Sequence, residues 1–117
     1  MDFKILFPTG HVVNDPFNDN VDVNIILQDR SVYFGSLFTI ENVKSFLNRG
    51  DVYFWSVDMV IVRDLYPSTI RESISLMIEN EYFQEAFAQI GVLGSEGAYK
   101  DVANYDSIID MDAGYNY

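Results

Sequence analysis

The stretch "VDVNIILQDRSVYFGSLFT", residues 21–39, decides the fold. In its first half apolar and polar side chains alternate with a period of two, the pattern of a half-buried strand. The apolar set is Val21, Val23, Ile25 and Leu27, and the polar set is Asp22, Asn24 and Gln28. Asp29 and Arg30 then separate two strand-like runs, which predicts a tight antiparallel hairpin. Gly35 lies inside the second run and indicates a bulge or a close backbone approach.

The segments on either side of this hairpin predict one more strand and a helix. "FKILF", residues 3–7, reads as a short strand that ends at Pro8. "TIENVKSFLNRG", residues 39–50, predicts a short amphipathic helix with Thr39 as its N-cap and Gly50 at its end. Its apolar residues at helical spacing are Ile40, Val43, Phe46 and Leu47.

Residues 52–62, "VYFWSVDMVIV", are apolar on both faces when read with a period of two. This predicts a strand in the middle of the sheet, covered on both sides or extended by a partner. Asp58 lies in this strand, with Ser56 on the same face. It is either a general acid or base whose pKa is raised by burial, or a structural carboxylate that accepts hydrogen bonds. We favour buried, structural roles for Ser56 and Asp58, because no second catalytic carboxylate or histidine can be assigned to them.

"STIRESISLMIENEYFQEAFAQIG", residues 68–91, predicts a second helix. Thr69 and Glu72 have the spacing of a capping box, and an apolar stripe follows, consisting of Ile70, Ile74, Met77 and Ile78. Two endings remain open. The helix either continues through Phe83, Phe87 and Ile90 or breaks near Asn80.

These elements predict an α+β fold with an antiparallel sheet of about four strands, in the order β-β-β-α-β-α, and both helices packed on one face. The length of 117 residues predicts a single domain, 1–117. Residues 92–117 show no convincing period, so we expect an irregular acidic tail there or a short strand around 107–110.

The charge is strongly negative. Eighteen acidic and seven basic residues give a net charge of −11, and from Glu72 onward nine acids accompany only Lys100. Such a field repels nucleic acid and anionic lipid, so we expect no nucleic acid and no membrane as partner, and a basic protein is favoured. The alternative is that the acidity only keeps the protein soluble.

The composition also restricts the chemistry. There is no cysteine, which excludes thiolate nucleophiles and favours a reduced compartment. No apolar run approaches the roughly 20 residues needed to cross a bilayer, and the N-terminus lacks the features of a signal peptide, so we expect a soluble, cytoplasmic protein.

His11, the only histidine, lies in a polar loop. It is either a solvent-facing side chain or part of a catalytic dyad or triad, and no nucleophile motif accompanies it. Asp106, Asp110 and Asp112 suggest calcium binding, but Gly114 stands where the EF-hand pattern from Asp110 requires a ligand, and the chain ends before position 12. We therefore expect neither metal nor cofactor.

Tyrosines accompany the acidic residues of the C-terminal half: Tyr82, Tyr99, Tyr105, Tyr115 and Tyr117. Aromatic anchors inside a charged rim are typical of interfaces, although these tyrosines could equally pack on their own domain. The residues expected to bind a partner are Glu79, Glu81, Tyr82, Glu85, Asp106, Asp110 and Asp112.

The segments "VYFGSLFTIENVKSFL" and "YFWSVDMVIVRDLYPSTIRESISLMIEN" resemble a family of small bacterial proteins of unassigned role, over roughly residues 20–90. In size, acidity and lack of catalytic motifs, the chain is also similar to immunity proteins that neutralise bacterial toxins. That second resemblance is compositional. It implies a bacterial inhibitor that covers a basic protein surface.

The leading functional hypothesis is therefore a non-enzymatic acidic binding protein, most concretely an inhibitor or immunity protein for a basic toxin or nuclease. The alternative is a small structural or regulatory domain that self-associates, for instance as a homodimer. An enzyme built around Asp58 and His11 is the third hypothesis.

Overall fold

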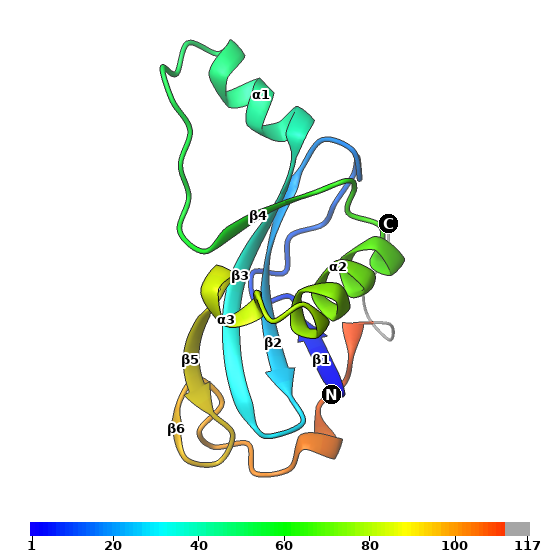
Figure 1. The fold of residues 1–117 in the computed structure, drawn as a ribbon, viewed down its shortest axis with the longest axis vertical. Helices are drawn as coiled ribbons and strands as arrows, with labels where there is room; N and C mark the ends of the chain where they lie inside the picture. The colour runs from blue at the N-terminus through cyan, green and yellow to red at the C-terminus, as the bar shows by residue number, and fades with distance from the viewer. Residues whose placement is uncertain (112–117) are drawn as a thin grey trace.

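The computed structural model describes residues 1–111, which form an α+β fold (Figure 1). Six strands within these residues make one sheet, with three helices and one 3-10 turn. The elements are β1 (Phe3–Leu6), β2 (Asn20–Leu27), β3 (Ser31–Thr39), α1 (Ile40–Asn48), β4 (Met59–Val62), α2 (Pro67–Glu79), α3 (Phe83–Ala86), β5 (Ala88–Val92), β6 (Glu96–Gly97) and η1 (Tyr105–Ser107).

The predicted hairpin is confirmed, and it forms the centre of the sheet. β2 and β3 pair antiparallel from Asn20 opposite Phe38 to Ile26 opposite Val32. Arg30 closes the turn with a positive φ of 82°, so a non-glycine residue adopts the left-handed conformation there. The strand order is β1-β2-β3-β5-β6. β4 also pairs with β3, along residues 36–39, whereas β5 pairs with residues 31–34. The expected number of four strands is wrong, because β5 and β6 arise from segments read as helix and irregular tail.

Gly35 permits a close approach in the middle of β3. A Cβ atom at this position would lie 2.3 Å from two ring carbons of Phe87, the residue that precedes β5. The Phe87 ring is buried and meets Phe83 edge-on, with ring centroids 5.5 Å apart. Glycine therefore lets an aromatic ring lie directly on the backbone of β3.

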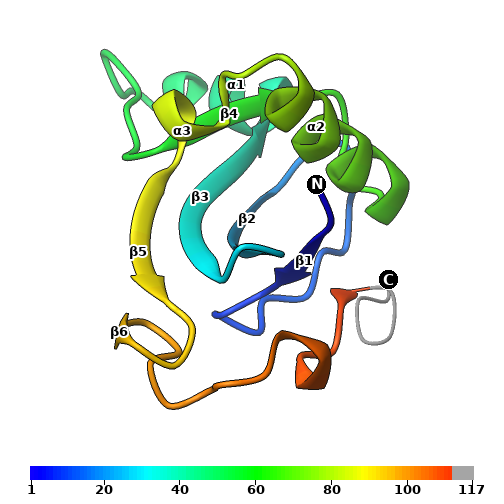
Figure 2. The ribbon, with the colours of Figure 1, turned by 60° about the horizontal axis from the view of Figure 1, so that its bottom comes forward.

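Both faces of the sheet are covered, by different parts of the chain. The larger core cluster lies between the sheet and α2, and its fully buried members include Ile5, Val23, Ile25, Leu37, Leu65, Ile70 and Ile74. A smaller cluster on the other face consists of Ile26, Val32 and Leu93, with Tyr99, Val102, Tyr105 and Ile108 packed against it. Figure 2 shows α2 and α3 on one side of the curved sheet and the η1 segment on the other.

Both helical predictions need correction, α1 in its packing and α2 in its N-cap. Thr39 caps α1 as expected, since its Oγ1 accepts a hydrogen bond from the Asn42 amide at 3.3 Å. However, α1 buries none of its residues and projects from one end of the molecule instead of packing on the sheet (Figure 1). α2 begins at Pro67 with Tyr66 as N-cap, so the predicted capping box does not form. Proline at the first helical position loses no intrahelical hydrogen bond, which explains this start.

The prediction of a buried central strand over residues 52–62 is wrong. Only Met59–Val62 is a strand, and it runs parallel to β3. Residues 51–58 form a loop in which Val52, Tyr53 and Trp55 are exposed. A period of two with apolar side chains on both faces is equally compatible with an extended loop, because periodicity reports side-chain type and not burial.

Residues 93–111 cover the second face of the sheet and then reach β1, and their regular elements are β6 and η1. Lys4 Nζ donates hydrogen bonds to the carbonyls of Tyr105 at 2.8 Å and Ile108 at 2.7 Å. The amide of Ile5 donates to Asp110 Oδ1 at 3.0 Å. The segment is thus fastened to the first strand by backbone and side-chain contacts. In the described part of the chain, no helix has both the length and the apolar character required for a membrane span.

Candidate protein-binding surface

A sharp corner joins α2 to α3 and carries three of the predicted binding glutamates. α2 ends at Glu79, and the Asn80 amide donates to the Leu76 carbonyl at 2.8 Å. Glu81 has a positive φ of 66°, which turns the chain away from the helix axis. The Tyr82 amide then donates to the Met77 carbonyl at 3.0 Å. Of the two endings left open by the sequence, the break near Asn80 is the one observed.

This corner separates an inward from an outward aromatic ring. Phe83 is 3% exposed and packs edge-on against Tyr33, with ring centroids 4.8 Å apart. Tyr82, its neighbour in the chain, is 63% exposed. The buried ring fixes the backbone, so the exposed tyrosine stands on a rigid support. We call Glu79, Glu81, Tyr82 and Glu85 the acidic corner.

The negative charge of the acidic corner is not neutralised within the described residues. Glu79, Glu81 and Glu85 are exposed, and none of them forms an ion pair with a side chain of residues 1–111. A shallow groove beside Glu81 extends to Asp29 on the β2–β3 turn. Its other lining residues are Met1, Leu27, Ile78, Phe83 and Gln84. The groove therefore combines apolar side chains with two carboxylates.

The other predicted acidic residues do not join this corner. Asp106 is exposed next to Tyr105, which packs on the opposite face of the sheet from Phe83. Burial and the nearby carboxylates of Asp2, Asp110 and Asp106 raise the pKa of the Tyr105 phenol. Asp112 lies outside the described residues. The expected acidic residues thus belong to separate surfaces.

Asp110 has a structural position that differs from the predicted surface role. It forms an ion pair with Arg71 of α2 while it accepts the hydrogen bond from the Ile5 amide. Its carboxylate is about one-third exposed and joins the C-terminal segment to two other elements. The carboxylate also accepts a hydrogen bond from the Met111 amide at 2.8 Å, so most of its acceptor positions are occupied within the chain.

Ser56 and Asp58 are half-buried instead of buried, and they lie in the loop and turn before β4. Asp58 has a positive φ of 50°, and its backbone carbonyl accepts the Ser36 amide at 2.9 Å. Asp58 thus contacts the sheet through its backbone carbonyl, at the point where the pairing of β4 with β3 begins. The prediction that the Asp58 carboxylate is buried is therefore wrong, because the long strand in which it was placed does not form.

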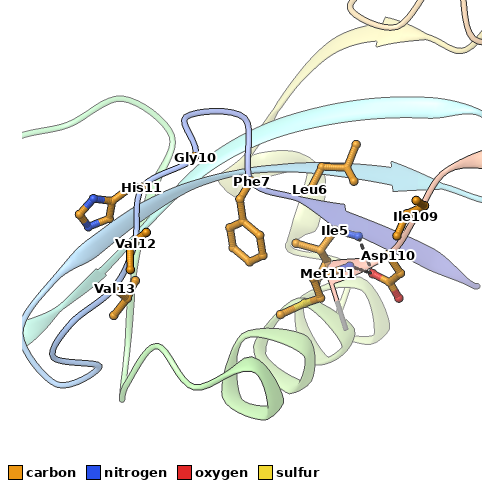
Figure 3. Close-up of a pocket in the computed structure, with 10 residues that line it drawn as sticks. All are labelled: Ile5, Leu6, Phe7, Gly10, His11, Val12, Val13, Ile109, Asp110 and Met111. Carbon is orange, nitrogen blue, oxygen red and sulfur yellow. Dashed lines mark hydrogen bonds between the residues drawn. The ribbon is translucent and has the colours of Figure 1, made fainter. Parts of the chain in front are cut away.

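His11 pairs with a residue that the sequence did not single out. Its Nε2 lies 2.8 Å from Asp19 Oδ2, and its side chain is 44% exposed. A His–Asp pair can orient an imidazole, but acyl transfer also requires a positioned nucleophile. Figure 3 shows His11 at one end of a pocket of about 300 Å³ and Asp110 at the other, with mainly apolar side chains between them. Asp110 in this pocket is already bound to the Ile5 amide and to Arg71.

Asp64 is a buried carboxylate among the described residues, and the sequence did not predict its role. Burial raises its pKa, but hydrogen bonds with Thr69, the Tyr66 amide and Arg63 outweigh this, and the pKa lies below its ordinary value. The available signal was its place three residues before Pro67, where a short acidic side chain can accept from the backbone before a helix. Asp64 thus holds the backbone at the start of α2.

No group of three metal-ligating side chains occurs among the residues that the structure describes.

No family model matches this chain, and neither a curated protein nor a solved structure is significantly similar to it.

Proposed function

We propose that the protein is a non-enzymatic binding protein that covers a basic site on another protein with its acidic corner. The observation that supports this is the arrangement of three exposed glutamates, free of ion pairs with the described residues, around the exposed Tyr82. Interface centres favour tyrosine, and charged rims provide specificity. An inhibitor or immunity protein for a basic toxin or nuclease is the most concrete form of this function.

Electrostatics determines how such a complex would form. A net charge of −11 steers a basic partner toward the protein from a distance, and the gain in association rate falls as salt screens the charges. The Debye length is about 8 Å at physiological ionic strength, so local carboxylates dominate once the partners approach. The acidic corner and Asp29 would then meet lysine and arginine side chains, while Tyr82 is buried at the centre.

The test is affinity capture from a lysate of the source organism, with washes at low and high salt. The bait carries either Glu79→Gln, Glu81→Gln and Glu85→Gln or a matched control with Glu72→Gln, Glu96→Gln and Asp101→Asn. Both triple variants remove three exposed negative charges, so they have equal net charge. A stoichiometric basic partner that the control retains and the corner variant loses supports the proposal. Equal recovery by the two variants would refute the assignment of this surface.

A further inference from the structure

A second exposed surface is apolar, in contrast to the acidic corner. Residues 40–58, which we call the α1 lobe, comprise α1 and the loop that leads toward β4. Figure 1 shows the α1 lobe projecting from one end of the long axis of the molecule. The extents of 45 × 28 × 26 Å reflect this elongated shape. The lobe is therefore remote from most of the acidic body.

The loop of the α1 lobe has one anchored ring between exposed apolar side chains. Phe54 stacks on Phe46 of α1, with ring centroids 5.0 Å apart, and meets Phe38 of β3 edge-on at 5.1 Å. Its neighbours Tyr53 and Trp55 are 77% and 74% exposed, and Val52 is 95% exposed. Further exposed apolar residues of the lobe are Ile40, Leu47 and Val57. The Phe54 contacts hold the loop in place, so its apolar side chains are presented to solvent by an ordered backbone.

This surface is large enough to be an interface. Full burial of an aromatic side chain covers about 150–250 Å², so Tyr53 and Trp55 together expose on the order of 300 Å². Four exposed aliphatic residues of the lobe add to this, so its exposed apolar area is of the order of the largest patches, about 300–600 Å², that occur on monomers and are often functional. α1 itself has nine residues and none is buried. Because helices shorter than about 12–15 residues are marginal without packing, cover from a partner would stabilise it.

The charge distribution selects the partner. The α1 lobe contains three acidic and two basic residues, a net of −1, so −10 of the total −11 lies on the rest of the chain. A basic protein would be drawn to that rest and not to the lobe. Two copies of this chain, in contrast, repel each other least where the two lobes face each other, because each lobe carries a net charge of only −1. Contact through the two lobes also places the sheet and α2 of the two copies on opposite sides of the interface (Figure 1).

We propose that the α1 lobe is the interface of a homodimer, with the loop around Tyr53 and Trp55 at its centre. A two-fold contact places the same patch of both copies face to face. Arg49, which lies over the Phe46 ring at 4.6 Å, and Asp51 of the other copy have opposite charges for the rim of such a contact. The acidic corner lies outside the lobe and remains free for another partner. The homodimer is thus independent of the function proposed above.

The sole tryptophan makes this testable, since Trp55 emission reports directly on the proposed interface. Sedimentation equilibrium over a concentration series should show a change from 13.4 kDa to twice that mass, together with a blue shift of the emission. High salt should leave the dimer intact, because apolar contact is not screened. The variant Val52→Ser/Tyr53→Ser keeps Trp55 and should weaken the dimer about tenfold or more.

The control variant Tyr82→Ser/Ile109→Ser removes two apolar side chains of similar exposure, 63% and 70%, outside the lobe, and should dimerise like the unmodified chain. A single 13.4 kDa species at all concentrations, or equal dimerisation of both variants, would overturn the proposal. Phosphatidylcholine vesicles provide the remaining comparison. A blue shift with vesicles in a chain that stays monomeric would assign the loop to lipid and would equally overturn it.

Discussion

Arg71 in the second turn of α2 forms an ion pair with Asp110, 39 residues later in the chain. The same carboxylate accepts the Ile5 amide, so one aspartate connects the helix, the first strand and the C-terminal segment. This geometry gives Asp110 a role in stability, in contrast to Asp106, which is exposed four residues earlier.

We expect Asp110→Ala to lower the free energy of unfolding by about 1–3 kcal/mol, because it removes the ion pair with Arg71 and the acceptor of the Ile5 amide. Urea denaturation at neutral pH measures this change. Asp106→Ala is the control and should remain within about 0.5 kcal/mol of the unmodified protein. Equal effects of the two substitutions would contradict the structural role of Asp110.

Asp64 predicts a defined pH dependence of stability. Its folded-state pKa lies below the ordinary value of 3.8, so the carboxylate contributes stability above pH 3.8 and loses it as the pH falls through the folded-state pKa. Asp64→Asn should cost about 1–3 kcal/mol at pH 7, and the difference from the unmodified protein should shrink below pH 3.8. Urea titrations from pH 7 to pH 2.5 test this. A difference that stays constant across this range would exclude the ionised carboxylate as its cause.

The close contact between Gly35 and Phe87 predicts a steric coupling. Gly35→Ala places a Cβ 2.3 Å from the ring and should destabilise the fold by roughly 1–3 kcal/mol. Phe87→Leu alone should also destabilise, because it removes a buried ring. The double variant should be more stable than the sum of the two costs implies, and a double-mutant cycle in urea measures this coupling. Strict additivity would show that the ring does not oppose the new methyl group.

Substitutions of Asp58 test whether the backbone of this residue or its carboxylate is required. With φ of 50°, Asp58→Asn should be nearly neutral, within about 0.5 kcal/mol, because asparagine tolerates the left-handed region. Asp58→Val should cost about 1–2 kcal/mol, since a β-branched residue is strained there. Thermal unfolding of the two variants provides the comparison. A large loss with asparagine would show that the carboxylate itself is required.

The central hairpin could be predicted because its information is local. Alternation over residues 21–27 and the short turn at Asp29 and Arg30 determine both strands without reference to the rest of the chain. The end of α2 was left open because Phe83, Phe87 and Ile90 continue the helical spacing. Residues 88–92 form strand β5 instead, because they pair with β3. This pairing joins Ser31 to Val92 across 61 residues, so it leaves no local signal in the sequence.

The candidate surfaces were predictable to different degrees. Exposure of Glu79, Glu81 and Glu85 follows from their charge and their position around the end of a helix. The ion pair of Asp110 could not be inferred, because nothing in the sequence relates it to Arg71. Exposure of Tyr53 and Trp55 contradicts the usual burial of aromatic residues. Such a departure from the local rule is expected at a surface that takes part in binding.

The strap of residues 105–111 over β1 has one more consequence, for aggregation. An open edge strand is a template on which another chain can add by backbone pairing. Here Lys4 and the Ile5 amide, which border that edge, are already engaged by the protein's own carbonyls and by the Asp110 carboxylate. A cleavage after Val102 would release this strap and expose the edge. The C-terminal segment therefore occupies one backbone group of this edge, and we expect it to make pairing with another chain less favourable.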